Sequence, residues 1–177
     1  DAGSASGSAY VLVRTGTLWS QQQKLTASDA ARDDWFGYSV AISGETIVVG
    51  AYFDDDAGVN SGSAYVFVRT GTVWSQQQKL TASDAAAGDL FGSALAISGE
   101  TIVIGAQFDA DAGSDSGSAY VFVRTGTVWS EQQKLTASDA AAFDHFGYSV
   151  RISGETIVIG SPGDNVAGGN SGSAYVF

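Results

Sequence analysis

The hexapeptide Ser-Gly-Ser-Ala-Tyr-Val occurs four times in this chain, at residues 6–11, 61–66, 116–121 and 171–176. Each copy begins 55 residues after the previous one, and the sequence between the copies is repeated with few changes. Self-similarity at one fixed spacing is the signature of an array of equal units that bury their apolar surface against their neighbours. We therefore interpret residues 1–177 as a single repeat array.

Four predicted strands account for most of the unit at residues 36–90. Residues 36–43 alternate between large and small side chains, which is typical of a strand whose two faces differ. Residues 46–51 contain the apolar run Ile-Val-Val, which suits a strand covered on both faces. Residues 63–69 alternate aliphatic with aromatic side chains, and residues 74–81 are mostly polar, as an exposed edge strand requires. The unit is predicted to be a four-stranded antiparallel sheet.

The first predicted strand also indicates how neighbouring units meet. Its alternation places the large side chains on one face, and these are Phe36, Tyr38, Val40 and Ile42. Small residues occupy the other face. We expect the large face to nest on the small face of the next unit, with the two sheets about 10 Å apart.

A four-stranded meander that recurs about every 50 residues is typical of β-propeller blades. We predict an all-β fold of about three blades: residues 36–90 and 91–145 as whole blades, residues 6–35 as the last two strands of a partial blade, and residues 146–177 as an incomplete blade. A flat β-solenoid is the alternative, although its repeats are usually shorter. Closed propellers typically have four to eight blades. We therefore expect either head-to-tail association of copies into a ring or filament, or an origin in a longer array.

The composition narrows the classes of function. The formal net charge is −11, which argues against binding to a nucleic-acid backbone or to anionic lipid. No apolar run is long enough to insert into a membrane. The chain has no cysteine and one histidine, His145, whose counterparts in other copies are Trp35 and Leu90. A catalytic base that the other copies lack is a poor assignment, so we expect no enzymatic activity.

The Phe-Gly pair at residues 36–37, followed by Val-Val-Gly-Ala at residues 48–51, resembles the FG-GAP repeat of integrin α-chains. The pair returns at residues 91–92 and 146–147, and in the last copy the second half of the motif reads Gly-Ser-Pro at residues 160–162. The resemblance implies a β-propeller with a non-catalytic role in adhesion, protein–protein interaction or structural self-assembly. It also implies an extracellular or cell-surface location.

One departure from the family concerns calcium. The integrin-type repeat carries a calcium-binding loop, Asp-x-Asp-x-Asp-Gly, between its first two strands, and this chain has Ser-Gly-Glu-Thr at the matching residues 43–46. A tight turn with one carboxylate cannot provide the six to eight oxygen ligands that calcium takes. The calcium site of the family is therefore not transferred to this turn.

In a blade of this kind alternate connections emerge on opposite sides, so the longer loops share one face of the array. The differences between copies are concentrated in these loops. Loops on a fixed scaffold commonly carry binding residues, and unconstrained drift would produce the same variation. The candidate ligand-binding residues on this face are Trp35, Leu90, His145, Tyr52, Phe53, Gln107 and Phe108.

Oxygen-bearing side chains recur in the loop after the second strand of each unit. Their alternating spacing is compatible with calcium binding, and turns stabilised by Asp and Asn side chains explain the same residues without a metal. The third copy has only Asp164, Asn165 and Asn170. The candidate calcium ligands are Asp54, Asp56 and Asn60 in one loop, and Asp109, Asp111 and Asp115 in the next.

Trp19, Trp74 and Trp129 begin the polar edge strands. Tryptophan rings can stack on sugars, and a calcium-assisted ligand- or glycan-binding propeller is therefore the alternative function. The structural interpretation is that each ring covers the outer core of its blade. The candidate partners are a protein, a second copy of this chain, or a glycan.

Overall fold

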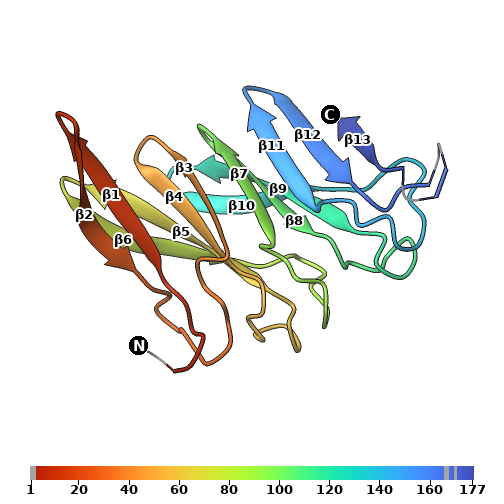
Figure 1. Cartoon of the computed structure of the whole chain (residues 1–177), viewed down its shortest axis with the longest axis horizontal. Helices are drawn as coiled ribbons and strands as arrows, with labels where there is room; N and C mark the ends of the chain where they lie inside the picture. The colour runs from red at the N-terminus through yellow and green to blue at the C-terminus, as the bar shows by residue number, and fades with distance from the viewer. Residues whose placement is uncertain (1–2, 166–167, 170) are drawn as a thin grey trace.

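A computed structural model describes residues 3–165, 168–169 and 171–177 of the chain (Figure 1). Within these residues the regular structure consists of strands, and none of them forms a helix, which confirms the all-β prediction. The strands, in chain order, are β1 (Ala9–Thr15), β2 (Leu18–Leu25), β3 (Ser39–Ser43), β4 (Thr46–Ala51), β5 (Ser63–Thr70), β6 (Val73–Leu80), β7 (Ala94–Ser98), β8 (Thr101–Ala106), β9 (Ser118–Thr125), β10 (Val128–Leu135), β11 (Ser149–Ser153), β12 (Thr156–Ser161) and β13 (Ser173–Val176).

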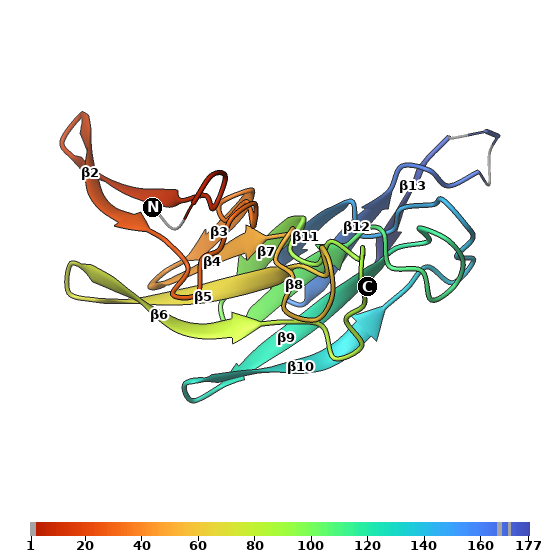
Figure 2. The same cartoon turned by 90° about the horizontal axis from the view of Figure 1, so that it is seen from below.

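The strands form four antiparallel sheets that follow one another along the chain. The sheets are β1–β2, then β3–β4–β5–β6, then β7–β8–β9–β10, and finally β11–β12–β13. Figure 1 shows them side by side along the long axis of the molecule. The first strands of successive sheets, β3, β7 and β11, contact one another, while the hairpins β5–β6 and β9–β10 extend away from them (Figure 2). This is the arrangement of successive propeller blades.

The strand register is the same in the last three sheets, because the sequence pattern is the same. Their second and third strands pair the valines Val48 with Val66, Val103 with Val121, and Val158 with Val176. A slip of one residue would turn every apolar side chain to the opposite face of its sheet. The same strand register is therefore needed in each sheet to bury the same apolar side chains.

Large side chains of one sheet pack on small side chains of its neighbour, but in the order opposite to the one expected. One core cluster combines the small side chains of the second sheet with the large side chains of the next unit, including Ala64, Val66, Phe91, Leu95 and Phe122. The large face of each unit thus covers the unit before it and not the unit after it. The alternation of large and small residues along a strand determines which side chains share a face of the sheet. It does not determine whether that face packs against the preceding unit or the following one. Full burial of one such apolar side chain contributes about 1.5–3 kcal/mol.

The first strand of the unit is shorter than predicted. The predicted strand began at Phe36, whereas β3 begins at Ser39, because Gly37 adopts a φ of 94° and turns the chain. Phe36 remains buried. Tyr38 packs instead on Tyr52, with the two ring centroids 4.0 Å apart.

Two glycines of the repeat motif meet at each junction between units. A Cβ atom on Gly50 would lie 2.1 Å from the carbonyl oxygen of Gly92 in the next unit, and a Cβ on Gly105 would lie 2.1 Å from that of Gly147. Both distances are far shorter than a van der Waals contact, so only glycine allows the two backbones to approach this closely. Packing between units therefore explains the glycines of the motif.

Replacing Gly105 by alanine should weaken its junction. The added methyl group would collide with the backbone of the next unit, and overpacking of this kind costs about 1–3 kcal/mol. Equilibrium unfolding in urea, followed by circular dichroism, measures the loss. The matched control is Gly160→Ala, at the same repeat position, where the nearest atom is the rotatable hydroxyl oxygen of Ser149. An equally large loss in the control would show that the contact between units is not the cause.

Candidate ligand-binding site

The longer loops gather on one side of the array, which we call the loop face (Figure 1). Backbone hydrogen bonds between successive units tie these loops together. The amide of Phe91 donates to the carbonyl oxygen of Ser61 at 3.0 Å, and the amide of Phe146 donates to that of Ser116 at 2.9 Å. The loop face therefore rests on a rigid base. It consists of residues 26–38, 52–62, 81–93, 107–117 and 136–148.

The residue before each Phe-Gly pair adopts a left-handed backbone conformation. Trp35, Leu90 and His145 have φ values of 57°, 56° and 55°. Such values are uncommon outside glycine and cost about 1–3 kcal/mol. Each amide is fixed by a carbonyl oxygen of the adjacent loop, at 3.1–3.2 Å. Three different side chains therefore occur at a position whose backbone conformation is the same in each unit.

Four aromatic residues form a group at the first of these positions, which we call the Trp35 cluster: Trp35, Tyr38, Tyr52 and Phe53. The ring centroid of Trp35 lies 5.7 Å from that of Phe53 and 6.1 Å from that of Tyr52, both edge to face. Tyr52 in turn lies 4.0 Å from Tyr38 and 4.1 Å from Phe53. Trp35 is still 45% exposed. The cluster is a fixed aromatic surface that is open to solvent.

A second group lies at His145, two repeat positions after Trp35. The ring of His145 lies 5.2 Å from that of Phe108, and its Nδ1 atom is 3.4 Å from the carbonyl oxygen of Gln107. Leu90 is half-buried at the equivalent position of the intervening unit. The structure thus brings the predicted ligand-binding residues together in two groups, with Leu90 at the repeat position between them.

The tryptophans of the edge strands serve packing. Trp74 and Trp129 are buried, and their indole N–H groups donate to the side chains of Gln22 and Gln77 in the preceding unit. The structural interpretation of these two rings was right, since buried rings cannot stack on a sugar. Trp19, at the same repeat position in the first unit, is 61% exposed.

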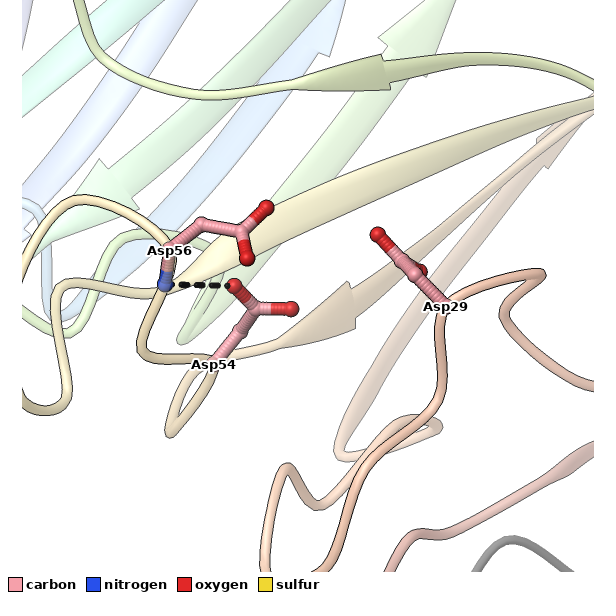
Figure 3. Close-up of side chains that lie close together, drawn as sticks. All are labelled: Asp29, Asp54 and Asp56. Atoms are coloured by element: carbon pink, nitrogen blue, oxygen red, sulfur yellow. Dashed lines mark hydrogen bonds between the residues drawn. The ribbon is translucent and has the colours of Figure 1, made fainter.

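Three carboxylates converge at each of two junctions between units. Asp29, Asp54 and Asp56 point toward one another from two loops (Figure 3), with oxygen atoms within 4.8 Å of each other. The same arrangement recurs one unit later with Asp84, Asp109 and Asp111. Carboxylate oxygens are the ligands of hard cations, so each group could bind a metal.

The groups of three carboxylates overlap only in part with the predicted ligand sets. Asp115 does not belong to the second group, and the backbone carbonyls of Asn60 and Asp115 accept hydrogen bonds from the adjacent loop. Asp29 and Asp84 belong to the groups and were missed. They come from the loop that enters the unit, where Thr-Ala-Ser-Asp recurs in every copy, and this recurrence was the available signal. Asn170, from the third copy, lies outside the described residues.

A lysine ammonium group contacts all three carboxylates of each group. Lys79 Nζ lies 2.9 Å from Asp29 and 3.0 Å from Asp54, and it also contacts Asp56. The hydroxyl of Tyr65 donates to Asp54 at 2.8 Å. In the second group Lys134 Nζ lies 2.7, 2.8 and 2.5 Å from Asp84, Asp109 and Asp111. The place that a metal cation would take is held by a cation of the protein itself.

These contacts alter the acidity of the carboxyl groups. Burial acts to raise the pKa of Asp29, but the hydrogen bonds from Lys79 and Tyr65 and the ammonium charge outweigh it and hold this pKa below its ordinary value of 3.8. The pKa of Asp84 is lowered beside Lys134 by the same balance of causes. A carboxyl group whose pKa falls on folding stabilises the fold above its unfolded pKa, and the contribution is lost as the pH falls.

Comparison with known proteins supplies independent evidence on the family. The family model described as the FG-GAP repeat matches residues 19–67, 74–122 and 129–177. These three windows follow the 55-residue period and together cover most of the chain. A comparison with curated proteins finds no match. In the described part of the chain, no helix is long and apolar enough to span a bilayer.

Replacing Lys79 by methionine should destabilise the chain and alter its response to acid. The substitution leaves the buried carboxylate of Asp54 without its ammonium partner, and breaking such a pair costs about 3–5 kcal/mol. In the unaltered chain the contribution of Asp29 is complete above about pH 4 and declines as the pH falls further, and the substitution should remove most of this decline. Melting temperatures measured from about pH 3 to pH 7 test both expectations.

The control for this experiment is Glu45→Gln, which removes the exposed ion pair with Arg69. Because exposed pairs contribute little, its melting temperature should stay close to that of the unaltered chain. Identical melting curves for Lys79→Met and the unaltered chain at every pH would contradict a stabilising role of the ammonium group.

Proposed function

Because the chain belongs to the FG-GAP repeat family, we propose that it is a non-catalytic module that binds a protein partner through the loop face. FG-GAP repeats form propeller-like modules that commonly serve adhesion or binding. The proposal includes an extracellular or cell-surface location, which is supported by the occurrence of these repeats in extracellular and surface proteins.

The Trp35 cluster is the observation that carries this proposal. Tryptophan and tyrosine dominate the binding energy of protein interfaces, since they bury a large apolar ring at a small cost in entropy. Trp35 and Tyr38 are exposed, while packing against Tyr52 restrains both rings. The strained backbone at Trp35 supports the same conclusion, because backbone strain is concentrated at functional sites.

The charge around the cluster indicates the kind of protein that would bind. Asp33 and Asp55 are exposed and belong to the same two loops as the Trp35 cluster. The whole chain carries a formal net charge of −11. Acidic groups around an aromatic centre favour a partner with lysine and arginine on its surface, and they raise the rate of association at low salt.

The non-catalytic part of the proposal is supported by the side chains present. FG-GAP repeats are generally non-enzymatic. The one histidine, His145, packs its ring on Phe108 and directs Nδ1 toward the carbonyl oxygen of Gln107. A catalytic imidazole would instead be paired with a nucleophile or a water. The histidine is better suited to direct contact with a partner.

Trp35→Ala and Tyr38→Ala should each weaken binding at least about tenfold, which corresponds to about 1.4 kcal/mol. The immobilised chain is tested against collagen, fibronectin and laminin at low and high salt, and against a glycan array. Tyr148→Ala is the matched control, because Tyr148 is exposed at the repeat position of Tyr38 but outside the cluster. If Trp35→Ala and His145→Ala bind every protein of the panel as tightly as the unaltered chain, the loop face is not the binding site.

A calcium-assisted ligand- or glycan-binding module is the second candidate, and the two groups of three carboxylates favour it. Calcium would have to compete with the ammonium group of Lys79 or Lys134 for the same oxygen atoms. The affinity for calcium is therefore expected to be low in the unaltered chain and higher once this charge is removed.

Lys79→Gln should increase the rise in melting temperature that excess calcium causes. A bound ion stabilises the fold by about 2.7 kcal/mol when its concentration is about one hundred times the Kd. Differential scanning fluorimetry in calcium and in chelator measures the effect, and Lys79→Arg serves as the control that keeps the charge. Unchanged melting temperatures in all three chains would rule out calcium binding at this group.

A further inference from the structure

A pocket of about 330 Å³ lies on the loop face in the middle of the array. Its lining comes from two loops: residues 81–93, which connect β6 to β7, and residues 107–117, which connect β8 to β9. Both loops join strands of the two complete four-stranded sheets. The lining combines the ring of Phe108 with carboxyl groups from both loops and with small residues.

The small residues distinguish this pocket from the equivalent place one unit earlier. Ala87 and Gly88 stand here where the preceding junction has Arg32 and Asp33. Arg32 lies 3.0 Å from Asp33, so the preceding junction provides a cation of its own to this part of the loop. The second junction has no such side chain, and a Cβ atom added to Gly88 would meet no atom within 4 Å. The pocket is therefore open at this point.

Asp89 is a buried residue of the lining that has one carboxylate oxygen without a partner. It is 6% exposed, and its one side-chain hydrogen bond within the described residues runs from the amide of Ala86 to Oδ2 at 2.7 Å. Among the described residues, Ser118 Oγ is the one fully enclosed side-chain atom that lacks a partner, so Oδ1 of Asp89 is still reachable. Because buried polar groups are nearly always hydrogen-bonded, this oxygen points to a donor in the pocket.

The acidity of Asp89 indicates that the donor should be a cation. Burial raises the pKa of Asp89 above its ordinary value of 3.8, and the charges of Asp109 and Asp84 add to this rise. The hydrogen bond from Ala86 and the charge of Lys134 act in the opposite direction without outweighing it. The pKa of Asp84, which Lys134 contacts directly, is lowered instead. A cation in the pocket would stabilise the charged form of Asp89 in the same way.

Two further groups of the lining suit a cation. Asp115 is half-buried, and its carboxyl group makes no hydrogen bond or ion pair within the described residues. The ring of Phe108 is also half-buried, and its contact with His145, edge to face at 5.2 Å, fixes its orientation. A cation over the face of an aromatic ring is attracted to it. The pocket therefore offers two carboxyl groups and an aromatic ring to a positive charge.

The chain itself shows which cation binds such a combination of groups. Lys134 Nζ contacts three carboxylates and lies 5.2 Å from the ring centroid of Tyr120. Lys79 Nζ likewise contacts three carboxylates and lies 5.1 Å from the ring centroid of Tyr65. In both places the cation is the primary ammonium group of a flexible aliphatic side chain. The pocket has the same combination of carboxyl groups and a ring, without the ammonium group.

We propose that this pocket binds a primary ammonium group carried on an aliphatic chain. The three N–H donors of the ammonium group bond to Oδ1 of Asp89 and to the carboxyl group of Asp115, and the charge lies over the ring of Phe108. A free diamine and a lysine side chain of another protein share this chemistry. The inference does not rest on the proposed function, since the pocket lies outside the Trp35 cluster and a small amine reaches it without a protein partner.

Isothermal titration calorimetry at low salt tests the pocket with two probes, 1,5-diaminopentane and Nα-acetyl-lysine methylamide. Asp89→Asn should weaken the binding of both at least about tenfold, because a hydrogen bond to a charged group is lost. Tighter binding of the diamine would assign the pocket to free amines, and tighter binding of the lysine derivative would assign it to a lysine of a partner. Binding of neither probe to the unaltered chain would overturn the proposal.

Asp34→Asn is the matched control, because Asp34 occupies the same repeat position at the preceding junction. It is also 6% exposed, and it accepts a hydrogen bond from the amide of Ala31 as Asp89 does from Ala86. Both substitutions therefore remove one charge from the same structural setting. The control should bind the probes as tightly as the unaltered chain, and an equal loss in both variants would overturn the location of the site.

Asp115→Asn provides a second test if Asp89→Asn does not fold. It introduces the residue found at the equivalent position Asn60, where φ is 57° compared with 54° at Asp115, so the loop should be retained. Circular dichroism verifies the fold, and binding should weaken about twofold to fivefold. Tetramethylammonium has the same charge as the lysine probe and no N–H donor. Equal affinity for this ion, or unchanged binding in folded Asp115→Asn, would overturn a hydrogen-bonded ammonium site.

Discussion

The packing of large side chains of one unit on small residues of the unit before it is the interaction on which the rest of the structure depends. A four-stranded sheet of this size cannot cover its own apolar face, so each unit is ordered only against a neighbour. The approach of Gly50 to Gly92 sets how closely the two sheets come together. Because the units are nearly identical, the same contact at every junction produces a regular array.

The stacking of neighbouring units determines which side chains of the loop face contact one another. Asp29 and Lys79 lie 50 residues apart in the chain and meet because two units stack. Their ion pair joins the loops of neighbouring units, while the glycine contact joins the cores of the sheets. The Trp35 ring, which packs on Tyr52 and Phe53 in these loops, is therefore ordered before a partner binds, and this reduces the entropy that binding would otherwise cost.

Much of the fold was predictable because residues 55 positions apart in the sequence occupy equivalent places in successive sheets. The limits of β4, Thr46–Ala51, agree with those predicted. The early part of the first strand was mispredicted because the turn at Gly37 is imposed by the preceding unit and not by local alternation. Asp29 was missed because its partners come from another loop and from Lys79, whose place in a polar edge strand gave no sign of an ion pair. By contrast, the placement of Trp35 and Tyr52 on the same face of the array followed from topology alone.

The left-handed backbone shared by Trp35, Leu90 and His145 bears on how such arrays evolve. Duplication of a unit begins with identical copies, and main-chain hydrogen bonds keep this loop in shape whichever residue stands there. Substitution at this position can therefore replace an indole by an aliphatic or an imidazole group while the architecture is retained. Gene duplication followed by such changes converts a uniform row of units into a row of chemically distinct contacts.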